Sequence, residues 1–283
     1  FHTTKLKDRQ ALVCKRSIEE GYPVVYVNLL GGQDELVFDG GSMAASEGQL
    51  TCQIPQFVEG LFPLQVQIDT MGVCRIITQE ILSSLSLEAQ VYEALVLGLR
   101  DYVMKNRFSG VVLGLSGGID SALSLAIAVD ALGAEHVEAV MMPFAYTSHM
   151  SLACAALQAN TLGVSYQIIA INEIYASFLD ALKHEFQGLD VDVTEQNIQS
   201  RARGVVLMAI SNKKGLLVLT TGNKSEIAVG YSTLYGDMAG GFDALRDVSK
   251  TLVYRLARYR NELQTCLLYT SDAADERSSV DLG

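Results

Sequence analysis

The chain has 283 residues, of which 49% are hydrophobic, so it can bury one large core or two smaller ones. Its formal net charge of −11 argues against a nucleic-acid backbone or an anionic membrane as its main partner. The longest apolar stretches have the length of strands, which predicts a soluble protein without a transmembrane span.

Cysteine usage and the first residue indicate where the protein works. The cysteines are odd in number, widely spaced and form no C-x-x-C pair, which favours reduced thiols in a cytoplasmic protein over a disulfide framework or a zinc site. They are Cys14, Cys52, Cys74, Cys154 and Cys266. The chain starts with Phe1 and shows no signal-peptide pattern, so we expect it to begin within a longer sequence.

The first region, residues 11–59, has the composition of β-strands and turns. Residues 21–30 predict a buried strand and residues 35–38 a second one. Glycine-rich segments at residues 31–34 and 39–42 predict the turns that follow these strands.

A linker and a helix come next. Residues 61–87 are mixed in composition and predict an extended linker. From residue 88 to 105, apolar side chains recur at Val91, Leu95 and Leu99, which predicts a helix that packs on a second domain.

From residue 110 onward, apolar strand-like runs alternate with helical patterns. Strands are expected at residues 110–115, 137–142, 164–170 and 216–220, and helices at 119–132, 150–162, 173–186 and 195–212, with one more starting near Lys224. Near-continuous apolar strands alternating with helices predict an α/β fold with a doubly wound parallel sheet. In such sheets, ligands bind beyond the carboxyl ends of the strands.

A glycine turn joins the first of these strands to its helix. In residues 116–121, Gly117 and Gly118 let the backbone N–H groups converge at a helix start, which favours a phosphate. A Walker A loop would require glycine and lysine where this chain has Ile119 and Asp120. A carboxylate beside phosphates needs a divalent cation between them, so Asp120 favours Mg²⁺ over an ordinary strand–helix turn.

The sequence of residues 116–121 resembles the pyrophosphate loop of the N-type ATP pyrophosphatases, which cleave ATP into AMP and pyrophosphate. With the segments at 195–204, 220–226 and 231–241, it resembles the synthetase domain of the glutamine-dependent NAD synthetases across about residues 88–262. Residues 27–40 resemble the end of the nitrilase-type glutaminase domain of the same family.

This resemblance implies a division of the chain. Residues 1–60 would be the C-terminal part of a nitrilase-like α/β sandwich, 61–87 a linker, and 88–264 a synthetase domain of the adenine nucleotide alpha hydrolase-like kind. Residues 265–283 resemble a translated sequencing adapter, and we set them aside as a tail that is not native.

The resemblance also implies an activity and its site residues. The family amidates deamido-NAD⁺: ATP adenylates the nicotinate carboxylate with release of pyrophosphate, and ammonia from glutamine then displaces AMP. The implied roles are ATP binding by Gly114, Leu115, Ser116, Gly117, Gly118, Ile119, Asp120, Ser121 and Thr221, deamido-NAD⁺ binding by Asn197 and Glu226, Mg²⁺ binding by Asp120 and Glu226, and glutamine binding by Lys5.

Each residue also has a simpler interpretation. Asn197 could cap a helix, Glu226 could complement a helix dipole, and Thr221 could belong to an ordinary turn. Lys5 could be an exposed lysine near a chain end. The joint pattern of the motifs, rather than any single residue, favours the functional roles.

The chain departs from the family pattern in several places. The glutaminase Glu–Lys–Cys set is expected upstream of residue 1, so Cys14 is interpreted as an ordinary thiol, and the C-terminal segment of the family is expected to be missing. Asp243 and Ser249 are local variations.

The leading hypothesis is therefore the glutamine-hydrolysing NAD⁺ synthase activity, in the cytoplasm and in a homo-oligomer when intact. The alternatives are another amidotransferase with a pyrophosphate loop, or an ATP-binding module without catalysis. The acidic balance disfavours a tRNA-modifying member of the group.

Overall fold

The computed structural model describes residues 1–79, 81–145, 147–236 and 238–263, and the segment 265–283 that we set aside lies outside these residues. The chain forms two compact units, Phe1–Tyr102 and the part that begins at Val103. Helix α2 (Leu87–Lys105) spans the division between them. In the described part of the chain we find no helix with both the length and the hydrophobicity of a membrane span.

The first unit contains helix α1, short antiparallel strands and most of helix α2. Helix α1 (Lys5–Glu19) packs against strand β4, with Leu6 and Val13 buried beside Met43 and Ala45. The three-stranded sheet has the order β1 (Val24–Tyr26), β4 (Met43–Ser46) and β5 (Gln49–Gln53), and the hairpins are β2 (Leu30–Gln33) with β3 (Leu36–Asp39) and β6 (Val66–Ile68) with β7 (Cys74–Ile76).

The prediction that residues 11–59 contain only strands and turns is wrong at its beginning. Residues 11–19 belong to α1, whose buried side chains Leu6, Val13 and Ser17 are seven and four positions apart and therefore share one helical face. This helical spacing is sparse, because the residues between the buried positions are mostly polar.

Two further boundaries differ. The expected buried strand at 21–30 is reduced to the half-buried β1, and residues 31–33 continue strand β2 rather than forming a turn. A β-carbon on Gly32 would lie 3.1 Å from the β-carbon of Asp101, and the Gly32 N–H donates to Asp101 Oδ2 at 2.8 Å. The glycine is therefore needed for close approach to α2 rather than for a turn.

Asp39 holds the first unit together. Arg9 donates to both of its carboxylate oxygens at 2.8 and 2.7 Å, and Asn28 and Gln56 each donate to it at 3.0 Å. Burial of Asp39 acts to raise its pKa, but these hydrogen bonds and the charge of Arg9 outweigh it and lower the pKa. The ionised carboxylate thus ties α1, the β2–β3 hairpin and the segment after β5 to one point.

The second unit confirms the predicted α/β architecture. Its five strands form a parallel sheet in the order β10-β9-β8-β11-β12, with β8 at the centre. The strands are β8 (Val111–Gly114), β9 (Val137–Met141), β10 (Ser165–Ile168), β11 (Leu217–Thr220) and β12 (Phe242–Asp243), and the helices are α3 (Ile119–Leu132), α4 (His149–Leu162), α5 (Asn172–Leu182), α6 (Val193–Lys214), α7 (Lys224–Ala228) and α8 (Lys250–Leu263), with a 3₁₀ turn at Ala134–His136. The sequence patterns did not predict β12 or α8.

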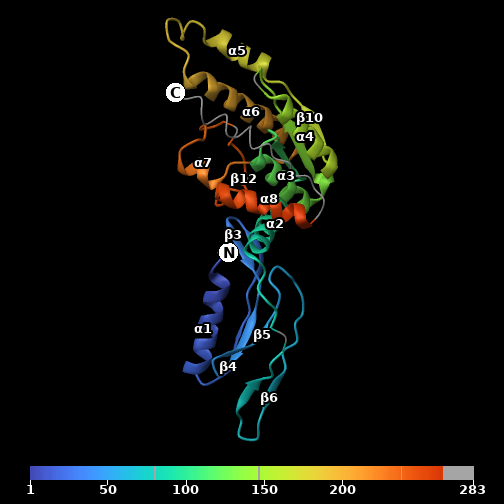
Figure 1. The fold of residues 1–283 in the computed structure, drawn as a ribbon, viewed down its shortest axis with the longest axis vertical. Helices are drawn as coiled ribbons and strands as arrows, with labels where there is room; N and C mark the ends of the chain where they lie inside the picture. Colours follow the sequence, from blue (N-terminus) through green and yellow to red (C-terminus); the bar gives the residue numbers. More distant parts are fainter. Residues whose placement is uncertain (80, 146, 237, 264–283) are drawn as a thin grey trace. The chain divides into compact units, whose positions relative to one another are not determined.

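Helices cover both faces of this sheet. Helix α3 contacts β8, β9, α4 and α8, whereas α6 contacts β8, β11 and α5 (Figure 1). Val112 and Val218 pack with Leu207 of α6 in one apolar cluster. Strands β9 and β10 add to one side of β8, and the later strands β11 and β12 add to its other side. The topological switch point, where the direction of strand addition reverses, therefore lies between β8 and β11.

We predict that Asp39→Asn destabilises the first unit. Neutralising this carboxylate leaves the partly buried Arg9 guanidinium without its counter-charge, at a cost of about 3 kcal/mol. Because the pKa of Asp39 is lowered on folding, its stabilisation is complete above its ordinary pKa and is lost as the pH falls through the folded value.

The measurement is hydrogen exchange of the α1 and β3 amides at pH 7 and at pH 3, with the exposed Glu35→Gln as the control. Exchange in Asp39→Asn should be faster than in the wild type at pH 7, and the difference should shrink at pH 3. Equal protection at pH 7 would contradict the role of this carboxylate.

Candidate nucleotide site

The loop after β8 lies at the carboxyl edge of the sheet next to the switch point. Val111, Val112 and Leu113 of the strand are fully buried, and Leu115 continues the chain with its N–H donating to Val140 O at 2.9 Å. The chain then turns through residues 116–118 into α3. The strand and the helix hold both ends of the loop in place.

Two serines close the loop on itself. Ser121 Oγ donates to Gly118 O at 3.0 Å and accepts from Ser116 N at 3.2 Å, while the two hydroxyl oxygens lie 3.0 Å apart. Ser116 Oγ also accepts from Gly118 N at 3.2 Å. The serines therefore fix the shape of the loop.

Gly117 is the position where only glycine fits. Its φ of +87° lies in the left-handed region, and a β-carbon there would lie 2.5 Å from the carbonyl oxygen of Ser151. Any side chain would have to displace the first turn of α4, so the loop can approach α4 this closely only with glycine.

The start of α3 is open to an anion. The N-cap residue of this 14-residue helix is Gly118, which has no side chain. The N-cap therefore provides no side-chain acceptor for the backbone N–H groups of the first turn. These donors and the helix dipole favour a negatively charged group such as a phosphate. The phosphate-binding role of this loop stays a prediction from the sequence.

Asp120 lies in the same turn, and both of its carboxylate oxygens are engaged. Asn223 Nδ2 donates to Oδ1 at 3.0 Å, and Lys250 Nζ pairs with Oδ2 at 2.5 Å. Only 8% of Asp120 is exposed, so the charge of Lys250 compensates a largely desolvated carboxylate.

Asn223 connects Asp120 to Glu226. It is fully buried at the N-cap of α7, where its Oδ1 accepts from Ser225 N at 2.9 Å and from Glu226 N at 3.1 Å. Glu226 Oε2 in turn accepts from Asn223 N at 3.2 Å, which completes a capping box. Asn223 thus donates to both predicted metal carboxylates, through its side-chain amide to Asp120 and through its backbone N–H to Glu226.

This arrangement can hold Mg²⁺ with help from a nucleotide. Among the described residues there is no group of three or more His, Cys, Asp or Glu side chains that could hold a metal alone. Mg²⁺ usually takes one or two carboxylates and completes its coordination with phosphate oxygens and water. The pair Asp120 and Glu226 fits that pattern of donors.

Other residues of the motifs lie on elements next to Asp120 and Glu226 or contact a different loop. Thr221 follows β11 directly and is half-buried, two positions before Asn223. Asn197 on α6 accepts from Thr233 Oγ1 at 3.0 Å, so among the described residues it contacts the loop after α7 rather than Asp120 or Glu226. Arg201 donates to Leu234 O at 3.2 Å and fixes the same loop.

Lys5 belongs to the first unit. It is exposed at the beginning of α1, where its backbone N–H donates to His2 O at 3.0 Å. Its expected role in glutamine binding stays a prediction.

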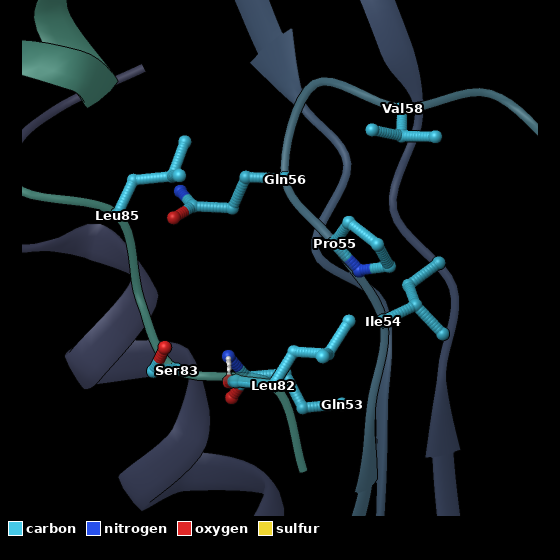
Figure 2. Close-up of a pocket in the computed structure, with 8 residues that line it drawn as sticks. All are labelled: Gln53, Ile54, Pro55, Gln56, Val58, Leu82, Ser83 and Leu85. Carbon is cyan, nitrogen blue, oxygen red and sulfur yellow. Dashed lines mark hydrogen bonds between the residues drawn. The ribbon is translucent and has the colours of Figure 1, made fainter. Parts of the chain in front are cut away.

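A cavity of about 260 Å³ also lies in the first unit, and its lining has no charged side chain. Figure 2 shows Gln56 and Leu85 on opposite sides of it, and the Gln53 amide donating to Leu82 O at 3.0 Å. Gln53 also accepts from Gln10, and Gln56 donates to Asp39 at 3.0 Å. The amides around this cavity mainly serve the packing of the unit, which makes it a poor match for a charged substrate.

Sequence reasoning missed two residues of the site. Asn223 lies in the 220–226 segment of the resemblance but was given no role, although an asparagine followed three positions later by a glutamate is a recognisable capping-box pattern. Lys250 carries no such signal, because its partner Asp120 is 130 positions away in the sequence. Only the packing of α8 against α3 brings the two together.

Comparison with known proteins gives a consistent result. Residues 91–272 match the family model described as NAD synthase, a range that extends into the segment we set aside after residue 264. The glutamine-dependent NAD(+) synthetase of Acinetobacter baylyi is 51% identical over 93% of this chain and 48% of its own length. That of Thermotoga maritima is 41% identical over 92% of this chain and 50% of its own. The chain thus spans about half the length of the curated relatives it matches.

Solved structures agree with these relatives. The glutamine-dependent NAD⁺ synthetase of Acinetobacter baumannii in complex with ADP is 47% identical, with a TM-score of 0.88 over 95% of this chain and 51% of that one. The NH3-dependent NAD synthetase of Campylobacter jejuni in complex with nitrate is 32% identical, with a TM-score of 0.58 over 68% of this chain and 82% of that one.

We predict that Asn223→Ala loosens α7 without unfolding the second unit. It removes the cap of α7, worth about 1 kcal/mol, and takes away the amide donor of Asp120. The amides of Ser225 and Glu226 should therefore exchange faster, with little change in β8 and α3. Lys224→Ala, on the exposed side of the same turn, is the control. Unchanged exchange at Ser225 and Glu226 would show that Asn223 does not organise this turn.

Proposed function

Because the chain belongs to the NAD synthase family, we propose that it carries out the ATP-dependent amidation of deamido-NAD⁺ to NAD⁺. The nicotinate carboxylate attacks the α-phosphate of ATP, and pyrophosphate leaves. Ammonia then attacks the acyl-adenylate, and AMP leaves. In the intact protein, the nitrogen comes from glutamine.

The observation that carries this proposal is the placement of the 116–121 loop beside the linked carboxylates of Asp120 and Glu226. A carboxylate that attacks a triphosphate brings two anions together, so the site must offset their repulsion. The open N–H groups of α3 and the charge of Lys250 supply positive potential at this point. Thr221, at the end of the neighbouring strand, is in position to contact the nucleotide.

Asp120 and Glu226 are the residues that would hold Mg²⁺, which would neutralise phosphate charge when bound. Lys250 pairs with Asp120 and holds its carboxylate in place. Asn223 donates to both carboxylates, from its side chain to Asp120 and from its backbone to Glu226. The protein's contribution is thus a fixed pair of oxygen donors beside the phosphate cradle.

The substrate that accepts the adenylyl group would bind on the β11 side of the loop. Asn197 and Glu226 are proposed to contact deamido-NAD⁺, with Asn197 acting near the loop held by Thr233. Lys5, in the first unit, is proposed to contact glutamine. We also propose a cytoplasmic location, which the four free cysteines of the described chain support, and a homo-oligomer in the intact enzyme.

The test of this function supplies the purified chain with MgATP, deamido-NAD⁺ and ammonium chloride. We expect NAD⁺, AMP and pyrophosphate in equal amounts, each dependent on deamido-NAD⁺. Asp120→Asn removes the charge but keeps an oxygen that can accept from Asn223 Nδ2, and it should abolish pyrophosphate release in a chain whose circular dichroism spectrum shows it to be folded. Formation of ADP and phosphate instead, or full activity of a folded Asp120→Asn, would overturn the proposal.

A second prediction isolates the charge of Glu226. Glu226→Gln keeps an oxygen that can accept from Asn223 N, so the capping box survives while the negative charge is removed. We expect a loss of about 2–4 kcal/mol in transition-state stabilisation of the adenylation step, comparable to the loss of one oxyanion donor. Single-turnover AMP formation measures it. A decrease of less than about threefold, near 0.7 kcal/mol, would leave Glu226 as a capping residue only.

A further inference from the structure

A second cavity, of about 280 Å³, opens at the carboxyl ends of β11 and β12. Its polar lining consists of Thr220, Ser232, Asp243 and Arg246, and Ile227 and Met238 are among its apolar neighbours. The cavity lies on the β11 side of the switch point, whereas β9 and β10 lie on the other side of the phosphate loop. It is therefore separate from the cradle formed by residues 116–121.

Asp243 is the unusual residue of this cavity. Its Oδ1 is buried and has no hydrogen-bond partner anywhere in the described chain. A β-carbon on Gly222 would lie 3.7 Å from its Oδ2, so the carboxylate lies against the segment that connects Thr221 to Asn223. A buried carboxylate oxygen without a donor is costly, so its presence beside a cavity indicates a ligand that donates hydrogen bonds.

Charge and donor geometry restrict the kind of ligand. Burial raises the pKa of Asp243 to about 6, against the effects of the Leu245 N–H, the Thr220 hydroxyl and the charge of Arg246, so the group is mostly ionised at neutral pH. A single carboxylate, with no group of three metal-ligating side chains in the described residues, suits a monovalent rather than a divalent cation. Arg246 is exposed, where water screens its repulsion of such a cation.

Hydroxyl groups complete an acceptor-rich site. The Thr220 hydroxyl lies 3.3 Å from Phe242 O and beside Asp243, and its oxygen has lone pairs that can accept from a ligand. Ser232 adds a second hydroxyl to the lining. An ammonium ion has four N–H donors and no acceptor, so its chemistry matches a lining of one carboxylate and hydroxyl oxygens.

We propose that this cavity is an ammonium-binding site in which Asp243 Oδ1 provides the counter-charge. The inference rests on the proposed function, because the amidation consumes ammonia, which is mostly protonated at neutral pH. Asp243 is a positioning residue here: it concentrates the nitrogen source beside residues 220–223, next to the strand end that contacts the nucleotide. It takes no part in the adenylation step.

The experiment measures the ammonium dependence of NAD⁺ synthesis by the full chain and by Asp243→Asn. We expect the KM for ammonium to rise about 10- to 100-fold, as for loss of a hydrogen bond to a charged group, with little change in kcat or in the KM values for ATP and deamido-NAD⁺. Glu185→Gln, an exposed carboxylate of the second unit outside this cavity, is the control and should leave the KM for ammonium unchanged.

Two additional measurements separate the possible failures. Exchange of labelled pyrophosphate into ATP, dependent on deamido-NAD⁺ and run without ammonium, reports adenylation alone and should be equal in wild type and Asp243→Asn. If this exchange is absent in the wild type, the proposed function fails; if it is present and the KM for ammonium is unchanged, the ammonium site is wrong.

A rise in the KM for deamido-NAD⁺ instead would overturn the proposal by assigning the cavity to that substrate. Ser232→Ala removes one hydroxyl at an exposed position and provides a second variant should Asp243→Asn fold poorly. We expect it to raise the KM for ammonium by a smaller factor, and an unchanged KM in a folded Ser232→Ala would contradict the site.

Discussion

The organisation of the second unit depends on the carboxylate of Asp120 and its two partners. Asn223 and Lys250 reach Asp120 from the starts of α7 and α8, so one buried negative charge brings together three segments that are distant in sequence. A largely desolvated carboxylate is stable only with a counter-charge and hydrogen-bond donors in good geometry. This requirement places Glu226 beside the phosphate loop, because Asn223 bonds both residues.

Hydrogen bonds within the 116–121 loop likewise fix its shape. Ser116 and Ser121 satisfy each other and the loop backbone, and Gly117 gives the clearance against α4. The internal hydrogen bonds leave the uncapped first turn of α3 free to face an anion. In the proposed reaction, such a rigid loop would need little reorganisation when charge develops as pyrophosphate leaves, which is where electrostatic stabilisation is most effective.

The first unit is also stabilised by an ionised carboxylate with several hydrogen-bond donors, that of Asp39. Asp39 gathers Arg9, Asn28 and Gln56 around one ionised carboxylate, and the bonds remain inside the unit. In Asp243, by contrast, one carboxylate oxygen lacks such a partner. Both oxygens of Asp39 thus accept hydrogen bonds within the unit, whereas Asp243 Oδ1 is the atom for which we propose a ligand.

The sequence by itself determined the parallel α/β architecture and the glycine turn between β8 and α3, because alternating apolar strands, glycine turns and helix starts are local patterns. The site roles of Asp120, Thr221 and Glu226 came from their motifs and stay predictions. It did not predict α1, whose buried positions are too sparse, nor β12, which has only two residues. Only the tertiary structure decided that Lys250 pairs with Asp120 and that Asp243 faces a cavity with an unpaired oxygen. Such contacts join residues from different elements, and burial changes the energy of a charge only once the elements have packed.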